Sequence, residues 1–235
     1  MLNTIAFDAD DTLWHTESLF VDIQEQFKEL LAHYHSPEWI DQRLLAVEKR
    51  NLEYFGYGVK GFTLSMIETA IELTEGRIEG HEIQKIIDFA KAMLTSPVEV
   101  LDGVEKTILT LKKTYSLMII TKGDLFDQES KIARSGLADH FTHIEIVSEK
   151  TSEVYRAILE KYQIPPEQFL MVGNSMKSDI LPVLAIGGKG VHIPYQITWE
   201  HEKVSETEKA QAEYFQLGNI GELTGFVEKL VVREE

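Results

Sequence analysis

The chain has 235 residues, of which 43% are hydrophobic and 26% charged, with no cysteine and a formal net charge of −16. This composition is ordinary for a globular protein with one large or two smaller domains, and the lack of cysteine excludes disulfides and thiolate metal sites. The acidic surface, without a basic stripe, indicates no nucleic acid polymer as a partner. No apolar run approaches the roughly 18 residues of a membrane helix, so we expect a cytoplasmic protein with no membrane contact. The oligomeric state is not readable from the sequence.

A short apolar run near the N-terminus ends in a cluster of acids. Residues 5–7 predict a strand, and Asp8, Asp10, Asp11 and Thr12 follow it. Because Asp8 and Asp10 lie two residues apart where the strand gives way to a loop, their side chains can converge at the strand's carboxyl end, where open α/β sheets bind ligands. Carboxylates this close repel each other unless a cation or a proton lies between them. The stretch therefore indicates a metal site.

The next eighty or so residues show helical periodicity. Apolar residues recur at helical spacing in four segments, and Thr16 is a candidate N-cap for the first of them. Ser36 and Pro37 predict the start of the second helix, Gly76 the end of the third, and Pro97 follows the fourth. Four amphipathic helices with short connections predict a small bundle, inserted after the first strand.

From Pro97 onward, predicted helices alternate with strands. Five segments have the apolar character of strands: 117–120, 144–147, 169–172, 190–193 and a last one near 214–215. Such alternation predicts an α/β fold with a doubly wound, mostly parallel sheet and helices on both faces. We expect residues 1–14 and 96–235 to form this core domain, and residues 15–95 to form the inserted helical domain.

Polar side chains follow four of the predicted strands at the edge where the carboxyl ends meet. They are Asp8 and Asp10, Thr121 with Lys122, Lys150, and Asn174 with Asp179. Carboxylates, an amide, a hydroxyl and ammonium groups are together suited to holding one metal ion and one phosphate.

This arrangement resembles the haloacid dehalogenase-like hydrolase superfamily, and specifically its magnesium-dependent phosphatases. The resemblance rests on residues 8–12 (DADDT), 121–123 (TKG), Lys150 and 173–179 (GNSMKSD), taken as the family's four motifs in order. The helical insert between the first and second motifs resembles the α-helical cap of the family. The resemblance thus implies a Rossmann-like catalytic core with a four-helix cap domain.

The resemblance also implies catalytic roles. Asp8 is expected to be the nucleophile that forms an aspartyl-phosphate, which water then hydrolyses, and Asp10 the general acid and base. Thr121 and Lys150 are expected to hold the transferring phosphoryl oxygens, with Lys150 supplying positive charge.

A magnesium ion is the implied cofactor. Its expected protein ligands are the Asp8 carboxylate, the Asp10 main-chain carbonyl, and the side chains of Asn174 and Asp179. Many relatives carry aspartate where this chain has Asn174. An amide oxygen can still bind Mg²⁺, but without charge, so either the affinity is lower or Asp179 takes a direct place.

Four further features surround these motifs. The main-chain amides of Lys122 and Gly123 are expected to bind substrate, although the Lys122 side chain could instead form a salt bridge with nearby carboxylates. Asp11 is expected to cap or orient the loop. The segment from Tyr195 to Glu202 could line the pocket, although packing is the favoured use.

The leading interpretation is a capped, magnesium-dependent phosphatase for a small phosphorylated metabolite. A haloacid dehalogenase is the first alternative, but such relatives lack an aspartate at the position of Asp10. A phosphonate-cleaving enzyme or a mutase also remains open. A non-catalytic binding or regulatory protein is favoured only by Asn174. The sequence does not name the substrate, because cap residues follow no transferable code.

Overall fold

The structure is a computed structural model that describes residues 2–197, 199 and 202–232. The chain divides into two compact units. The first comprises Met1–Glu17, Val98–Lys122 and Gln128–Glu235, and the second comprises Ser18–Pro97 and Gly123–Asp127.

The first unit is built on a six-stranded sheet. Its strands are β1 (Thr4–Phe7), β2 (Ser116–Lys122), β3 (His143–Val147), β4 (Phe169–Gly173), β5 (Lys189–His192) and β6 (Phe215–Gln216). They lie in the order β3-β2-β1-β4-β5-β6, and each pairing is parallel. The predicted α/β class with a doubly wound parallel sheet is confirmed.

Helices cover both faces of this sheet. They are α5 (Val104–Leu111), α6 (Leu125–Arg134), α7 (Ser152–Lys161), α8 (Leu181–Leu184), α9 (Glu206–Gln211) and α10 (Leu223–Val232), with the short helices η1 (Ala138–His140), η2 (Pro166–Gln168), η3 (Met176–Ile180) and η5 (Ile220–Glu222). The first residues of α6 belong to the second unit.

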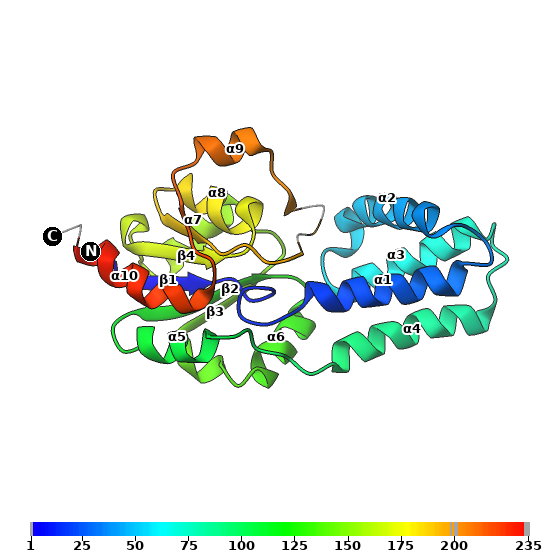
Figure 1. Ribbon diagram of the computed structural model, residues 1–235, viewed down its shortest axis with the longest axis horizontal. Coiled ribbons are helices and arrows are strands. Elements are labelled where there is room, and N and C mark those ends of the chain that lie inside the picture. The colour runs from blue at the N-terminus through cyan, green and yellow to red at the C-terminus, as the bar shows by residue number, and fades with distance from the viewer. Residues whose placement is uncertain (1, 198, 200–201, 233–235) are drawn as a thin grey trace. The chain divides into compact units, whose positions relative to one another are not determined.

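Alternation along β1 assigns its side chains to two cores. Ile5 and Phe7 pack in one hydrophobic cluster with residues of α5, α6 and α10, whereas Ala6 packs in another with residues of α7 and α8. Figure 1 shows α5 and α6 on one side of the sheet and α7 and α8 on the other. Because both faces are covered, the central strands are apolar throughout, as parallel sheets require.

The strand register sets the position of the first acid. Phe7 pairs with Ile119 of β2 and with Val172 of β4, and the backbone amide of Asp8 donates to the carbonyl of Val172 at 2.9 Å. The residues that follow β1, β2 and β4 therefore emerge at the same edge of the sheet.

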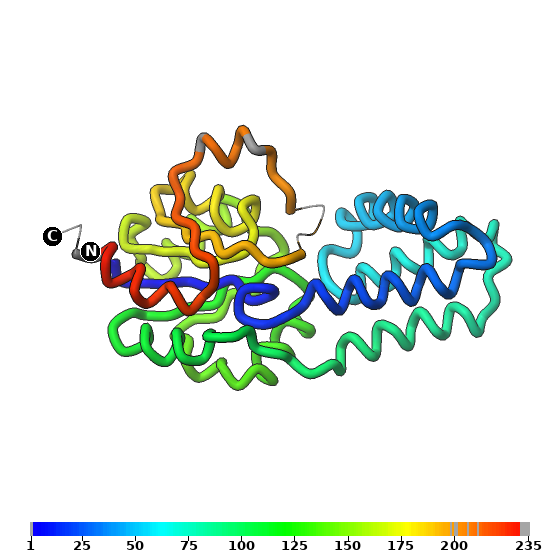
Figure 2. Tube along the Cα trace, in the orientation of Figure 1, coloured from blue at the N-terminus to red at the C-terminus, as the bar shows by residue number. Residues whose placement is uncertain are grey.

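The second unit contains four helices, α1 (Glu17–Leu31), α2 (Pro37–Phe55), α3 (Val59–Leu73) and α4 (Gly80–Thr95). Figure 2 follows them as one continuous stretch of the trace, from blue to green. Phe27, Leu44, Met66 and Ile86 are fully buried in their shared core. The four predicted helices are confirmed.

The boundaries of α2 and α3 follow the expected signals. Ser36 accepts a hydrogen bond from the backbone of Trp39, and Pro37 is the first residue of α2. Gly76, with φ 75°, follows α3. Among the helices in the described ranges, none is both long and apolar enough to cross a bilayer.

Candidate active site

Asp8 follows β1 and has a buried carboxylate. Lys150 Nζ lies 2.5 Å from its Oδ1, and Thr12 Oγ1 donates to its Oδ2 at 3.3 Å. Burial raises the pKa of Asp8 to about 7, because the loss of water outweighs the attraction of Lys150, and the charge of Asp179 adds to the rise. A positive charge near Asp8 therefore favours its ionised form.

Lys150 provides a fixed positive charge after β3. Its side chain is 2% exposed, and its Nζ contacts both Asp8 and, at 2.7 Å, Asp179 Oδ1. Burial alone would lower the pKa of Lys150, but the two carboxylates outweigh it and raise this pKa well above its usual value. Thr151 starts α7 by accepting from the backbone of Val154, which fixes the chain directly after Lys150. The lysine thus stays charged between two acids.

The fourth motif turns sharply so that Asp179 points back at the sheet. The turn is η3, a π-helical segment, and Ser175 N donates to Asp179 Oδ2 at 2.9 Å. Gly173 permits this approach, because a Cβ there would lie 2.2 Å from Asp179 Oδ2. Asp179 is completely buried. A single turn of unusual geometry therefore delivers the second carboxylate to Lys150.

The side chains of Asn174 and Asp8 both contact the hydroxyl of Thr12. Thr12 Oγ1 is 3.4 Å from Asn174 Oδ1 and 3.3 Å from Asp8 Oδ2, so one hydroxyl flanks both oxygens. His192 Nε2 lies 3.0 Å from the main-chain oxygen of Asn174 and holds this part of the backbone. The structure thus brings Asp8, Asn174, Asp179 and Lys150 together.

Asp10 is held by four donors. Trp14 Nε1 and Thr16 Oγ1 donate to its Oδ1 at 2.9 and 2.8 Å, and Gln128 Nε2 donates to its Oδ2 at 2.8 Å. Lys131 Nζ lies 2.7 and 2.9 Å from the two oxygens. Burial alone would raise the pKa of Asp10, but Lys131 and the other donors hold this pKa below its usual value. These contacts fix the position of the Asp10 carboxylate at the edge of the sheet.

The first long helix begins at Glu17, and the side chain of Asp11 accepts from the backbone amides at its start. Asp11 adopts φ 61°, and its Oδ1 accepts from the backbone amides of Thr16 at 2.8 Å and Glu17 at 3.1 Å. The prediction that Asp11 caps or orients the loop is confirmed. The prediction that Thr16 is the N-cap is wrong, because its hydroxyl donates to Asp10 instead.

The side chain of Lys122 forms salt bridges with carboxylates, as the sequence suggested it could. Its Nζ lies 2.6 Å from Glu202 Oε1, 3.1 Å from Ser178 Oγ and 3.4 Å from Glu149 Oε1. The side chains of Lys122 and Glu202 are 12% and 14% exposed. The expected salt bridge of the Lys122 side chain with nearby carboxylates is therefore confirmed, and the contact of its main-chain amide with substrate stays a prediction.

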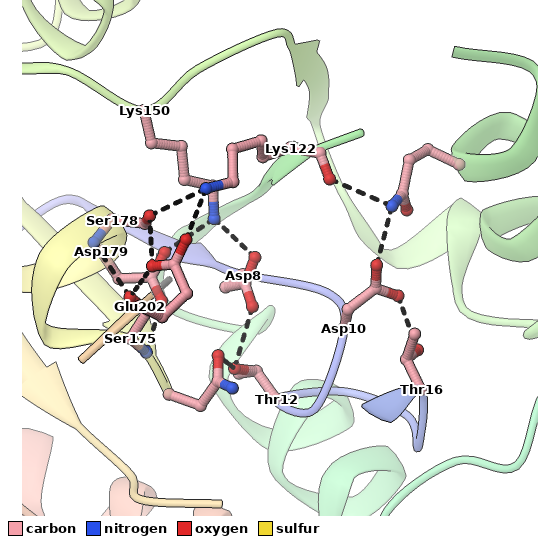
Figure 3. A network of polar contacts seen from close by, with 12 residues as sticks. Asp8, Asp10, Thr12, Thr16, Lys122, Lys150, Ser175, Ser178, Asp179 and Glu202 are labelled. Atoms are coloured by element: carbon pink, nitrogen blue, oxygen red, sulfur yellow. Dashed lines mark hydrogen bonds and ion pairs between the residues drawn. The ribbon is translucent and has the colours of Figure 1, made fainter. Parts of the chain in front are cut away.

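Glu202 is a polar residue of the site to which the sequence assigned no role of its own. Its Oε2 accepts from Ser178 Oγ at 2.6 Å and from Ser175 Oγ. Burial alone would raise the pKa of Glu202, but Lys122 and the two serines lower it to about 2. Figure 3 shows Glu202, Ser175, Ser178 and Lys122 in one network with Lys150, Asp179 and Asp8. The only signal for Glu202 was its position after a late strand at this edge.

Gly123 belongs to the second unit, together with Asp124 to Asp127. Its φ of 150° is one that glycine adopts readily. The contact of its main-chain amide with substrate stays a prediction.

Comparison with known proteins identifies the family. A family model for haloacid dehalogenase-like hydrolases matches residues 2–187. The chain belongs to the haloacid dehalogenase-like hydrolase family. A haloacid dehalogenase-like hydrolase from Xanthomonas campestris is similar in structure, with a TM-score of 0.88, 43% identity, and coverage of 99% of this chain and 93% of that one.

Curated relatives of this hydrolase include phosphatases. The glyceraldehyde 3-phosphate phosphatase of Pyrococcus furiosus is 35% identical over 99 residues, 40% of this chain and 41% of that protein. The match thus spans about two fifths of that relative's length. The pyrimidine 5'-nucleotidase YjjG of Escherichia coli is 26% identical over 189 residues, 75% of this chain and 79% of that protein.

The oxygen donors of this haloacid dehalogenase-like core fit a divalent cation. Within the described residues, no group of three His, Cys, Asp or Glu side chains is arranged to bind a metal ion. The carboxylate of Asp8 and the amide oxygen of Asn174 nevertheless flank one hydroxyl, and burial raises the pKa of Asp8 to about 7. Hard oxygen donors, including an uncharged amide, are the ligands that such cations prefer. Phosphatases of this family generally use a divalent metal.

Thr121 supplies an unused hydroxyl at the end of β2. Thr121 is 1% exposed, and its Oγ1 has no hydrogen-bond partner within the part of the chain that the structure describes. Because buried hydroxyls are nearly always hydrogen-bonded, this atom fits an oxygen of a bound ligand.

Proposed function

We propose that the protein is a magnesium-dependent phosphatase that hydrolyses a small phosphorylated metabolite through an aspartyl-phosphate. The observation that carries the proposal is the buried row of Asp8, Lys150 and Asp179, with Lys150 Nζ 2.5 Å from the expected nucleophile. A fixed ammonium group beside a buried carboxylate is suited to receiving a phosphoryl group, whose oxygens carry negative charge.

The first half of the reaction transfers the phosphoryl group to Asp8. A carboxylate oxygen of Asp8 attacks phosphorus, and the bond between phosphorus and the ester oxygen breaks. The leaving oxygen takes the proton that Asp10 gained from water in the preceding turnover. Lys150 and the unpartnered hydroxyl of Thr121 hold the transferring oxygens.

The second half releases phosphate. Asp10, now a carboxylate, takes a proton from a water molecule that attacks the phosphorus of the aspartyl-phosphate. The bond between phosphorus and the Asp8 oxygen breaks, which regenerates the free carboxylate and gives inorganic phosphate.

Asp8, the main-chain carbonyl of Asp10, Asn174 and Asp179 would hold the magnesium ion. When bound, the ion neutralises charge between the nucleophile and the phosphate. The ion also supplies the positive charge that the raised pKa of Asp8 indicates is needed.

The relatives support the substrate class. Their names are those of phosphatases for glyceraldehyde 3-phosphate, pyrimidine nucleotides and N-acylneuraminate 9-phosphate, all small phosphorylated molecules. We therefore propose that the substrate of this protein is also a small phosphorylated metabolite and not a polymer. We also propose that residues 15–95 act as a cap domain that excludes water and selects the substrate.

The test is hydrolysis of an aryl phosphate and of a panel of phosphorylated metabolites, with magnesium and after complete chelation. We expect turnover that requires the metal, that Asp8→Asn abolishes, and that the exposed control Asp139→Asn retains. Haloacid hydrolysis that survives chelation, without phosphatase activity, would show a dehalogenase instead. No turnover of any compound by the intact protein would favour a binding protein.

A further inference from the structure

Lys131 lies outside the four motifs, yet it contacts the expected proton-transfer residue. Its Nζ lies 2.7 Å from Oδ1 and 2.9 Å from Oδ2 of Asp10. The side chains of Lys131 and Asp10 are 13% and 25% exposed, so water screens the pair only in part.

Two donors from α6 act on Asp10 from the same side. Gln128 and Lys131 are three residues apart on α6, which places them on one helix face. Trp14 and Thr16, from the loop that carries Asp10, donate to Oδ1. Within the described part of the chain, the contacts made to Oδ2 come from Gln128 and Lys131. The local loop thus contacts Oδ1 alone, whereas α6 contacts both oxygens.

We propose that Lys131 is a positioning residue that, with Gln128, holds the Asp10 carboxylate in the orientation required for proton exchange with the leaving group and the attacking water. The inference rests on the proposed phosphatase function and adds a residue to it. Lys131 touches no reacting atom in this scheme and acts through Asp10.

The geometry explains why this pair matters more than a surface ion pair. Exposed pairs contribute little, because water screens them and both side chains lose freedom. Here one ammonium group reaches both oxygens of a mostly buried carboxylate, so its removal leaves only Gln128 on Oδ2 among the described residues and loosens that oxygen. Misplacement of a catalytic group by about 1 Å can cost about 10²-fold in rate.

Substitution separates positioning from general stability. We expect Lys131→Met to lower kcat about 10- to 100-fold with KM changed less than about threefold, because the phosphate contacts remain. Lys131→Arg should restore most of kcat, since a guanidinium also reaches both oxygens. The control Lys161→Met removes an equally short pair, 2.6 Å to Glu145, and should leave kcat unchanged.

A double-mutant cycle tests whether Lys131 acts through Asp10. In the Asp10→Asn background, Lys131→Met should cause no further loss, because the group that it positions is already gone. Losses that multiply would overturn the proposal, as would a folded Lys131→Met protein with the wild-type kcat.

The indole of Trp14 gives a readout that does not require activity. Trp14 Nε1 donates to the same Asp10 oxygen that Lys131 contacts, and the chain has three tryptophans. Their N–H signals in an ¹⁵N spectrum can be assigned with Trp39→Phe and Trp199→Phe. We expect Lys131→Met to move the Trp14 signal and Lys161→Met to leave it in place.

The two proposals fail in different ways. If the wild type hydrolyses no phosphate ester, the proposed function is wrong, but the Trp14 signal still decides whether Lys131 orients Asp10. If the wild type is active and the Trp14 signal of Lys131→Met does not move, Lys131 does not hold Asp10 and the inference is wrong.

Discussion

The ammonium nitrogen of Lys150 lies 2.5 Å from a carboxylate oxygen of Asp8, and the two side chains are 2% and 10% exposed. A second carboxylate, that of Asp179, lies 2.7 Å from the same nitrogen. One buried cation therefore stabilises two buried anions, and the positions of all three depend on each other. Stability and activity are for this reason coupled at this site.

Lys150→Met should damage both properties. The substitution leaves two buried carboxylates without their cation, so we expect a loss of about 3–5 kcal/mol in the free energy of unfolding. The kcat should fall at least about 10²-fold in any folded fraction, because the charge on the transferring oxygens is lost. Urea unfolding and steady-state kinetics measure these effects. Lys161→Met is the matched control, and a Lys150→Met protein of normal kcat would contradict the assignment.

Thr121→Val should separate stability from activity. The hydroxyl of Thr121 is buried without a partner within the described residues, so its removal should leave the free energy of unfolding unchanged or raise it by up to about 1 kcal/mol. The kcat should fall about 10-fold or more, because a donor to the phosphoryl oxygens is lost. Thr121→Ser keeps the hydroxyl and should keep most of the activity. Full activity in the valine variant would show that this hydroxyl does not touch substrate.

Gly173→Ala should disable the site through Asp179. The new Cβ would lie 2.2 Å from Asp179 Oδ2, which forces this carboxylate away from Lys150. We expect lower stability and a large loss of kcat, measured by thermal unfolding and by aryl phosphate hydrolysis. Gly225→Ala is the control, because no atom lies within 4 Å of its new Cβ and the residue is inside α10. That variant should gain about 0.5–1 kcal/mol and keep its activity.

Glu202→Gln should change how stability depends on pH. The folded-state pKa of Glu202 is about 2, below the ordinary 4.5, so its ionised form stabilises the fold above pH 4.5. This contribution, at most about 3 kcal/mol, is lost as the pH falls from 4.5 towards 2. Urea unfolding at pH 7, 5 and 3.5 should show the variant less stable at the two higher values, with a smaller gap at the lowest. The exposed control Glu213→Gln should show no such gap, and an equal gap at each pH would contradict this prediction.

Much of the architecture was predictable from local patterns. The apolar run before Asp8, and the apolar segments that follow Pro97, predicted the strands because both faces of a parallel sheet are buried. Ser36 and Pro37 marked a helix start because each acts on the adjacent backbone. Asp8, Lys150 and Asp179 could be expected to meet, because the carboxyl ends of parallel strands share one edge.

Other members of the site left no comparable signal. Gln128 and Lys131 resemble any polar pair on a helix, and nothing near Glu202 in the sequence marks it as a partner for Lys122. Thr16 was misassigned because a hydroxyl before a helix usually caps it, whereas here the carboxylate of Asp11 takes the backbone amides and leaves the hydroxyl for Asp10.

The sequence by itself determined the class of fold, the family and the acids and lysine that gather at the edge of the sheet. Periodicity, helix signals and strand ends are properties of neighbouring residues, and these can be read along the chain. Only the tertiary structure decided that Lys131 contacts Asp10 and that Glu202 forms a salt bridge with Lys122. Each of these pairs joins residues 80 or more positions apart, and their contact depends on how whole elements pack.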